Sequence, residues 1–515
     1  MSRFTVSGVS LPSGLFINNE WVQGHGERLQ VVNPATEEQI AEIETASRED
    51  VDLAVAAARA AFESTWGTWV SGQERGQLLF KLADLVEANI DELAVLERVD
   101  GGKPAGWARV DIVDTVACFR YFAGAADKIH GSVVEIDDQR KHAVLRKEPI
   151  GVVAQIVPWN YPLLMMAWKV APALSAGCAI VFKAAEQTPL STLRFAELVK
   201  EAGYPAGAFN LVNGVGAVTG ETLSRHLDID KVGVGASLDA GADARQIAFT
   251  GSTATGRRIA VAAAESNLKK VTLELGGKSA NIVFAGANLP EAAKWAAFGV
   301  YENMGQSCSA GSRVLVQESV YDEFVKLFVA AASAFKVGPT EDEDTFQGPQ
   351  ISKVQFDKIL GLIEAGKAAG AKCVLGGARH GTKGYFIQPT VFTDVDMGMR
   401  IAQEEIFGPV ASIIKFKDEA EAIAIANATE YGLAAAVHTT DYNQVNRVTR
   451  RLKAGTVWVN QYVIVSHQIP FGGYKQSGWG RELGMEGLEP YLTTKSVHHY
   501  YDEEGFEWPI RLSKL

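Results

Sequence analysis

Runs rich in β-branched residues alternate with stretches of helical periodicity along most of this chain, and that alternation constrains the fold more than any other feature. In the stretches between runs, apolar residues recur at the spacing of amphipathic helices. Strands that alternate with helices form parallel sheets that helices cover. The sequence therefore predicts an α/β fold. The runs that we expect to form strands are residues 152–157, 179–182, 247–249, 271–275, 314–317 and 456–459.

Two segments illustrate the helical stretches. Residues 47–50, Ser-Arg-Glu-Asp, resemble a helix cap, and the apolar residues after them recur at intervals of three and four: Val51, Val55, Ala58 and Phe62. The apolar stretch 165–182 is barely long enough to cross a membrane and contains Lys169, Pro172 and Gly177. We expect it to form a buried helix followed by a strand.

The length of the chain indicates how many domains it forms, and its charge excludes some classes of partner. Its 515 residues suffice for roughly two to four domains. The 61 acidic and 49 basic residues give a net charge of −12, which repels nucleic acid and anionic membrane surfaces. We therefore expect neither as a partner. Four scattered cysteines and a start without a signal-peptide core favour a cytoplasmic location.

One segment does not fit the alternation. Residues 232–246 are rich in Gly, Ala and Asp and lack both proline and apolar periodicity. Such composition is typical of connecting segments. We expect a flexible surface loop there.

A candidate nucleophile, Cys308, lies in the sequence Gly-Gln-Ser-Cys-Ser-Ala-Gly at 305–311. Small neighbours leave its sulfur accessible and let the backbone approach a bound ligand closely. A free cysteine is more often a small buried hydrophobe, so context alone leaves both interpretations open. Cys178 continues an apolar run and is expected in the core, whereas Cys118 and Cys373 have no supporting motif.

Two polar residues stand beside predicted strands. Glu274 is near the end of a predicted buried strand, where burial would raise the pKa of its carboxyl group and suit a general base, although most glutamates face solvent. Asn160 lies between Pro158 and Pro162, which would fix its backbone. A rigidly held amide can donate to an oxyanion, although Asn in a turn is more often only a turn residue.

A phosphate-binding turn is plausible at 249–256, where glycines join a predicted strand to a helix. Lys183 and Glu186 follow another predicted strand. The glycine pattern differs from the usual dinucleotide fingerprint, and the lookalike at 214–220 has one residue too many, so we set the lookalike aside. The histidines and cysteines lack the spacing of metal ligands, and we expect no catalytic metal.

Six motifs, taken together and in order, resemble those of the aldehyde dehydrogenase superfamily. The resemblance runs from about residue 15 to residue 497. It implies a Rossmann-like cofactor domain, an α/β catalytic domain and a β-strand arm that joins subunits. The motifs are PWNYPL (158–163), FTGSTATG (249–256), LELGGKS (273–279), GQSCSAG (305–311), EEIFGPV (404–410) and PFGGYKQSGWGRE (470–482).

The resemblance also sets domain limits. The NAD-binding domain would comprise residues 1–130 and 150–275, and the catalytic domain residues 276–480. Residues 131–149 and 492–501 would form the arm, whose strands would expose sheet edges in a single subunit. We therefore expect a homodimer or homotetramer.

The chemistry implied is NAD(P)-dependent oxidation of an aldehyde to a carboxylic acid, without phosphate or coenzyme A. Cys308 would attack the aldehyde, and the Asn160 amide and the Cys308 backbone N–H would hold the oxyanion. After hydride transfer, Glu274 would activate the water that hydrolyses the thioester. Lys169 and Glu482 match positions that relay the proton.

Cofactor positions also carry over from the resemblance. Lys183 and Glu186 match residues that bind the adenosine ribose. A carboxylate there repels a 2′-phosphate and favours NAD, although Lys183 leaves NADP open. The other matching positions are Trp159, Gly251, Ser252, Glu405 and Phe407.

The implied substrate pocket is apolar and partly aromatic. It lacks an arginine that would bind a substrate carboxylate, which favours hydrophobic aliphatic or arylalkyl aldehydes over semialdehydes. Glu302 also matches a position near this pocket, and the sequence assigns it no role. The lining residues are Tyr161, Met165, Trp168, Ser307, Ser309, Val465 and Phe471.

The chain departs from the family pattern at two places. Ala184 stands where the family usually has proline, and residues 232–246 have no counterpart. Removing them restores the motif, which suggests a retained intron; peptide mapping of natively expressed protein tests this hypothesis. Because the segment directly precedes the run that delivers Gly251 and Ser252, a displaced strand would weaken cofactor binding.

Two other functions remain open. An acylating dehydrogenase would pass the thioester to coenzyme A or phosphate, which the presence of Glu274 disfavours. A catalytically silent scaffold would keep the fold for binding alone. The joint presence of Cys308, Glu274 and Asn160 disfavours the scaffold.

Overall fold

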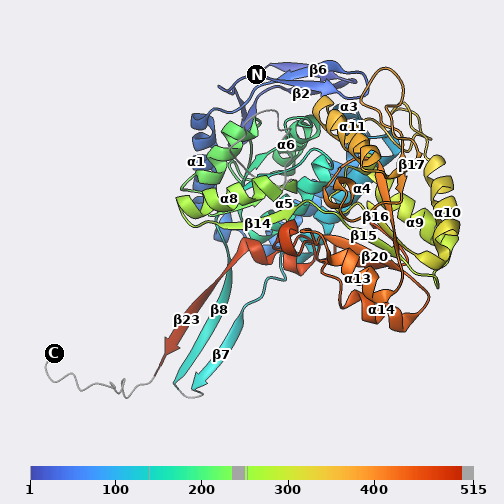
Figure 1. The fold of residues 1–515 in the computed structure, drawn as a ribbon. Coiled ribbons are helices and arrows are strands. Elements are labelled where there is room, and N and C mark those ends of the chain that lie inside the picture. The colour runs from blue at the N-terminus through green and yellow to red at the C-terminus, as the bar shows by residue number, and fades with distance from the viewer. Residues whose placement is uncertain (1, 138–139, 235–249, 252, 502–515) are drawn as a thin grey trace.

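Two sheets organise the chain, and a third projects from the body as an arm (Figure 1). The structure is a computed structural model that describes residues 2–137, 140–234, 250–251 and 253–501. Two short hairpins lie outside the three sheets; they pair β1 (Arg3–Val6) with β2 (Val9–Pro12) and β5 (Leu29–Asn33) with β6 (Glu38–Ile43).

The larger sheet has nine strands and a parallel centre. Antiparallel strands β3, β4 and β22 complete it. The strands follow the order β13 (Thr250–Gly251), β14 (Lys270–Leu275), β12 (Lys231–Val234), β9 (Val152–Ile156), β10 (Ala179–Lys183), β11 (Phe209–Leu211), β3 (Leu15–Ile17) and β4 (Glu20–Val22), while β22 (Gly478–Trp479) pairs with β14.

Strand β12 occupies a place that the sequence analysis gave to a loop. It pairs in parallel with both β9 and β14, and Gly233 stands opposite Gln155 and Thr272. The predicted loop at 232–246 is therefore wrong for residues 232–234. A ladder is made by backbone N–H and C=O groups, so a four-residue run without periodicity is enough to fill it. The rest of the segment and the predicted strand 247–249 lie outside the described residues.

Helices cover the larger sheet in two layers. Those that pack on its strands are α1 (Arg48–Ser64), α5 (Pro162–Ala176), α6 (Leu190–Ala202) and α8 (Thr253–Ser266). Behind α5 and α6 lie α2 (Gly72–Ala88), α3 (Ile90–Gly101) and α4 (Ala105–Ala125), and the short α7 (Glu221–Arg225) contacts α8. The predicted cap is confirmed, because Ser47 and Asp50 form a capping box at the start of α1.

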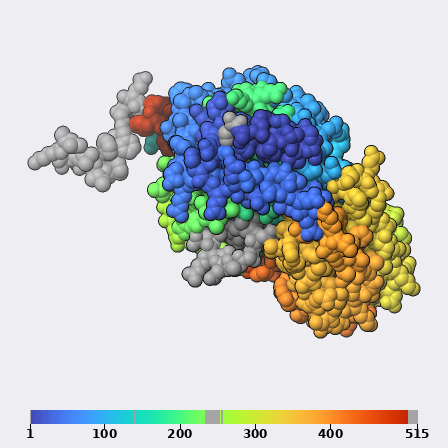
Figure 2. Space-filling model, turned by 90° about the horizontal axis from the view of Figure 1, so that it is seen from above, coloured from blue at the N-terminus to red at the C-terminus, as the bar shows by residue number. Residues whose placement is uncertain are grey.

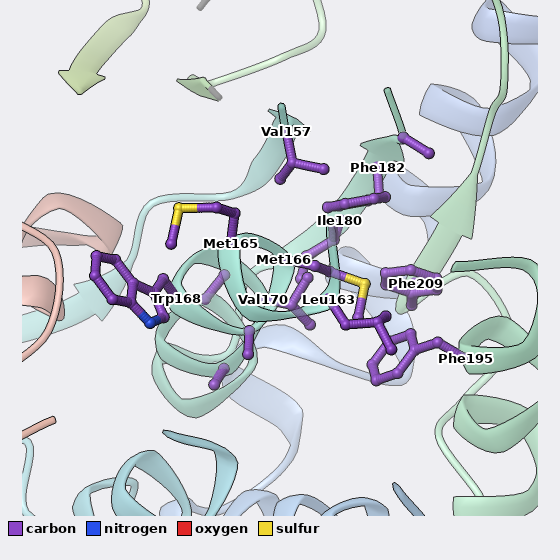
Figure 3. Close-up of a cluster of buried hydrophobic side chains, with 14 of the residues drawn as sticks. Val157, Leu163, Met165, Met166, Trp168, Val170, Ile180, Phe182, Phe195 and Phe209 are labelled. Atoms are coloured by element: carbon purple, nitrogen blue, oxygen red, sulfur yellow. The ribbon is translucent and has the colours of Figure 1, made fainter. Parts of the chain in front are cut away.

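Helix α5 is buried along its whole length, which agrees with the predicted buried helix and strand at 165–182. Met166 and Leu163 point toward the phenylalanines of β11 and α6, whereas Trp168 lies on another side of the helix (Figure 3). One helix thus supplies both core packing and, through Trp168, a wall of the cavity described below.

The smaller sheet has seven strands and lies in the C-terminal half of the chain. Its order is β17 (Lys372–Leu375), β18 (Thr390–Thr393), β19 (Val410–Phe416), β16 (Arg313–Gln317), β15 (Ala280–Val283), β20 (Ala434–His438) and β21 (Thr456–Val459). The helices of this region are α9 (Leu289–Tyr301), α10 (Tyr321–Ser333), α11 (Lys353–Ala368), α12 (Arg400–Gln403), α13 (Glu419–Asn427) and α14 (Tyr442–Thr449).

Seen from above, the blue N-terminal part and the yellow-to-orange part that carries the smaller sheet lie on different sides of the molecule (Figure 2). The α/β fold predicted from the alternation is confirmed, and the expected strands within the described residues appear as β9, β10, β14, β16 and β21. Across the described ranges, the structure contains no helix with the length and apolar character needed to span a membrane.

The arm consists of β7 (Ser132–Asp137), β8 (Lys141–Pro149) and β23 (Leu492–Tyr500), in the order β23-β8-β7. Only Ile150 and Gly151 separate β8 from β9 of the larger sheet. Gly151 has φ +131°, and a Cβ there would meet Asp230 Oδ2 at 2.0 Å. The same oxygen accepts hydrogen bonds from Val152 N at 2.8 Å and from Arg59 at 2.5 Å. The junction between arm and body therefore has a fixed geometry.

The position of β12 can be tested at Gly233. Proline there removes a ladder N–H, so we expect Gly233→Pro to lower the free energy of unfolding by about 2–3 kcal/mol relative to Gly233→Ala, which keeps that N–H. Urea unfolding followed by circular dichroism measures the difference. Equal midpoints for the two variants would place residue 233 outside the sheet.

Candidate functional site

The candidate site lies where parallel strands of the larger sheet end. Asn160 follows β9, Lys183 ends β10, and Glu274 is the penultimate residue of β14. Ligand sites of open α/β sheets lie at this carboxyl edge. Cys308 reaches the same place from the other side, on the loop between α9 and β16.

The loop that carries Cys308 is held by close backbone packing. A Cβ on Gly277, just after β14, would meet the Cys308 carbonyl oxygen at 2.2 Å. Tyr462 donates a hydrogen bond to the Ser309 carbonyl at 2.8 Å. Before the cysteine, Asn303 and Met304 have φ of 49° and 59°. Non-glycine residues seldom adopt this conformation, which costs about 1–3 kcal/mol and clusters at functional sites.

Cys308 is half-buried and lines a cavity of about 340 Å³. Burial, and then the nearby carboxyl groups of Glu274, Glu405 and Glu482, raise the pKa of its thiol well above the ordinary value. The resting sulfur is therefore protonated at neutral pH, and forming the thiolate requires a group that takes the proton. Cys178, expected in the core, is fully buried.

Asn160 is buried beside the cysteine loop. Its Nδ2 donates to the Gln306 carbonyl at 2.8 Å, and Asn303 Nδ2 donates to the Asn160 carbonyl at 2.9 Å. These bonds fix the amide, and the NH₂ group has a second N–H besides the one given to Gln306. Asn160 and Cys308 line the same cavity, so this N–H can serve an anion formed next to the sulfur.

Glu274 is buried rather than exposed to solvent. Its Oε1 has no hydrogen-bond partner among the described residues. Burial and the charge of Glu482 raise the pKa of the Glu274 carboxyl group well above its usual value, against the opposing effect of Lys169 and Arg481. A carboxyl group with a raised pKa that faces a cavity has the properties of a general base.

A polar path continues from Glu274. Lys169 Nζ lies 2.5 Å from Glu482 Oε1, and the lysine is almost fully buried. A second, small cavity of about 10 Å³ is lined by both Glu274 and Glu482. That volume is close to the space that one water molecule needs. The predicted relay residues thus lie next to the predicted base.

All seven residues expected to form the substrate pocket line one cavity of about 340 Å³, together with Cys308, Asn160 and Glu274. The sequence analysis missed a second set of lining residues. Four of them, Trp107, Val110, Asp111 and Asp114, follow the i, i+3, i+4, i+7 spacing of one face of α4, which was the available signal. The others are Leu164, Phe298, Val463, Ile464 and His467; Glu302, noted without a role, also lines the cavity.

Lys183 and Glu186 lie together at the end of β10. Lys183 is buried, and burial lowers the pKa of its ammonium group despite Glu186, whose Oε1 lies 4.0 Å away. Glu186 Oε1 also accepts a hydrogen bond from Gly216 N at 2.6 Å. The glycine segment that we set aside, 214–220, therefore borders this site. An acceptor and a donor side by side fit the two hydroxyls of a ribose.

Glu405, Phe407 and Trp159 form a second group between the two sheets. Glu405 Oε1 accepts from Gly277 N at 2.9 Å, and burial raises the pKa of its carboxyl group to about 7. Phe407 packs edge-on to Trp159, with ring centroids 5.3 Å apart. The Trp159 indole N–H is buried and has no partner among the described residues. A Cβ on Gly276 would fill the space beside Glu405.

Glu186 and Glu405 are carboxyl acceptors that each hold one backbone N–H, and the Trp159 indole N–H is a buried donor without a partner among the described residues. Gly251 ends the edge strand β13, and Ser252 lies outside the described residues. Within the described ranges, no cluster of three or more His, Cys, Asp or Glu side chains is arranged to hold a metal ion.

Comparison with known proteins agrees with this geometry. The profile described as "Aldehyde dehydrogenase family" matches residues 21–497. An aldehyde dehydrogenase of Emericella nidulans is 56% identical over 489 residues, which cover 95% of each chain. Aldehyde dehydrogenase 1A1 of Gallus gallus is 51% identical and covers 94% of this chain and 92% of its own. An aldehyde dehydrogenase of Bacillus cereus, solved with NAD+, has TM-score 0.90 and 46% identity over 95% of this chain and 96% of its own.

The raised pKa of Cys308 predicts how the thiol reacts with iodoacetamide. Only the thiolate reacts, so labelling should still increase above about pH 9, where an ordinary cysteine is mostly ionised. In Glu274→Gln, loss of one neighbouring negative charge should speed labelling by about tenfold, because one pKa unit is tenfold in thiolate. Peptide mass spectrometry measures the rate at Cys308.

Glu318→Gln, on the surface, is the matched control and should label at the wild-type rate. A labelling rate that levels off below pH 8, or that does not change in Glu274→Gln, would contradict the assigned environment of the thiol.

Proposed function

This chain belongs to the aldehyde dehydrogenase family of oxidoreductases, and we propose that it oxidises an aldehyde to a carboxylic acid with NAD through a thioester on Cys308. One observation carries the proposal: Cys308, the Asn160 amide and the buried carboxyl group of Glu274 line a single cavity. They are a nucleophile, an anion-stabilising donor and a base.

The first step is attack of the Cys308 sulfur on the aldehyde carbon. The sulfur forms a bond to that carbon, the carbonyl π electrons move to oxygen, and the thiol proton goes to a base. The cavity of about 340 Å³ has room for a water molecule that takes this proton, so Glu274 stays available as the base for the hydrolysis step. The product is a thiohemiacetal.

The oxyanion of that intermediate needs fixed donors. The second Asn160 N–H and the Cys308 backbone N–H supply them. Because Gln306 and Asn303 hold Asn160 in place, the donors need little reorganisation when charge develops. Bound NAD would supply the acceptor for the hydride of the former aldehyde carbon, and loss of that hydride would convert the thiohemiacetal on Cys308 into a thioester.

Hydrolysis of the thioester calls for an activated water. Glu274 takes a proton from water, hydroxide adds to the thioester carbon, and the Cys308 sulfur leaves with its electron pair. The proton then passes toward Glu482, which lines the small cavity next to Glu274 and forms an ion pair with Lys169. This path returns the carboxyl group to its basic form for the next cycle.

NAD is the cofactor that the ribose site favours. Glu186 accepts hydrogen bonds from ribose hydroxyls and repels a 2′-phosphate, whereas Lys183 beside it softens the repulsion. Glu405 and Phe407 would border the nicotinamide end. In this proposal the larger sheet, apart from β22, belongs to the cofactor domain (1–130 and 150–275) and the smaller sheet to the catalytic domain (276–480). The NAD+ in the Bacillus cereus relative supports the assignment.

The arm supports a homo-oligomer. Every residue of β7 is exposed, including Val133, Val134 and Ile136. An exposed edge strand with apolar side chains can pair with other chains and cause aggregation, and pairing between subunits covers this edge. We therefore infer that the arm joins two or more copies of this chain.

The activity can be tested by following reduced nicotinamide with hexanal, phenylacetaldehyde and succinic semialdehyde, each with NAD and NADP. We expect turnover that falls by at least about a thousandfold in Cys308→Ala and persists in the control Cys373→Ser. Glu274→Gln should release about one equivalent of reduced nicotinamide and then stall, because the thioester is not hydrolysed.

Turnover that depends on added coenzyme A would instead indicate an acylating enzyme. If the wild-type protein oxidises none of these aldehydes, the proposed activity is overturned and the catalytically silent scaffold is favoured.

The oligomer can be tested with Val134→Asp on β7. A charge on this exposed apolar strand should shift the protein to a smaller species in sedimentation velocity, whereas Val374→Asp, on β17 and exposed to the same 44%, should not. A monomeric wild-type protein at micromolar concentration would refute the inference.

A further inference from the structure

The cavity that holds Cys308 has an acidic wall. Besides Glu274, three carboxyl groups line it: Asp111 and Asp114 on α4, and Glu302 in the short turn after α9. No lysine or arginine is among the described residues that line the cavity. The single histidine, His467, has its pKa lowered by burial and is neutral at pH 7.

One of the three acids is already neutralised. Lys103 and Asp111 form a close, buried ion pair, and Lys103 Nζ also lies 4.2 Å from the centroid of the Tyr161 ring. Lys103 therefore already contacts Asp111 and the Tyr161 ring behind the cavity wall. Its charge offsets Asp111 and leaves the other two acids without a cationic partner.

Glu302 and Asp114 have no salt bridge to any described residue. Glu302 is buried, and its carboxyl oxygens accept only from the Tyr161 hydroxyl, at 2.7 and 2.9 Å. Asp114 is exposed on the cavity side of α4. Burial of a carboxylate without a cation is costly, and burial raises the pKa of Glu302 to about 7. A positive charge brought by a ligand would remove that cost.

Aromatic rings line the same cavity. Trp107 packs against Phe298, with ring centroids 5.7 Å apart, and Trp168 packs against Phe471 at 5.4 Å. Ring faces attract alkylated ammonium groups as well as hydrocarbon chains. The cavity thus joins an apolar aromatic passage, suited to the alkyl chain of an aldehyde, with carboxylates suited to a cation.

We propose that the cavity selects aldehydes that carry an alkylammonium group at the end remote from the carbonyl, with Glu302 and Asp114 as the residues that recognise the cation. This inference rests on the proposed activity and names its substrate class. The same carboxylates repel semialdehydes, whose remote group is an anion.

A matched pair of substrates isolates the charge. 4-Trimethylammoniobutanal and 5,5-dimethylhexanal have the same chain and the same branched end, and differ in a nitrogen cation against a neutral carbon. Succinic semialdehyde supplies an anionic end. The quantity to measure is the ratio of kcat/KM for the cationic aldehyde to kcat/KM for the neutral one.

We expect the wild-type ratio to exceed one and to fall by about tenfold in Glu302→Gln, the loss typical of one partly desolvated charge contact. Glu302→Gln keeps the size of the side chain and a hydrogen-bonding partner for Tyr161. Asp114→Asn, at an exposed residue on the cavity side of α4, tests the second acid without disturbing the buried turn. The double variant should show the lowest ratio, and the surface change Glu318→Gln should leave the ratio at the wild-type value.

A ratio that stays unchanged in the double variant would overturn the proposal, while turnover of the neutral aldehyde would leave the proposed activity intact. A binding measurement keeps the two failures separate. Butyltrimethylammonium should quench the fluorescence of Trp107 and Trp168, and the double variant should bind it about tenfold more weakly. Equal binding by both proteins would also overturn the proposal, even in a protein that oxidises nothing.

Discussion

The close approach of the Gly276–Gly277 turn to the cysteine loop is the contact on which the rest of the site depends. A Cβ on Gly277 would meet the Cys308 carbonyl oxygen at 2.2 Å, and a Cβ on Gly276 would displace the carboxyl group of Glu405. The turn follows directly from Glu274 in β14. One stretch of side-chain-free backbone therefore brings together Glu274, the proposed base, on one sheet, Cys308, the proposed nucleophile, on a loop that leads to the other sheet, and the carboxyl group of Glu405.

That arrangement concentrates carboxyl groups in a poorly solvated space. Each raises the pKa of its neighbours, and burial adds to the effect, so both the Cys308 thiol and the Glu274 carboxyl group hold protons more tightly than usual. The nearby positive charges, Lys169 and Arg481, offset only part of it. Chemistry at such a site consists largely of moving protons between groups that resist ionisation, which explains why a paired lysine and glutamate border the base.

The sequence predicted much of the fold because hydrophobic periodicity is local: α1 with its Ser47 cap and the strands on either side of α5 appear where the pattern placed them. Strand β12 was missed, since four residues with a central glycine carry no pattern and gain their place only from the backbones of β9 and β14. The seven expected pocket residues share one cavity because they lie in family motifs. The acidic wall was missed because Asp111 and Asp114 come from α4, remote in sequence from those motifs, and only tertiary packing turns that helix face toward Cys308.

The junction at Gly151 fixes the direction in which the arm leaves the body. Its backbone conformation suits glycine alone, and Asp230 fills the space where any side chain would go. A single subunit therefore already fixes the angle at which β8 leaves the body. In an assembly joined through such arms, the arrangement of the subunits would depend on the backbone conformation at this one residue. Substitutions there would change that arrangement in evolution without changing any residue of the cavity that holds Cys308.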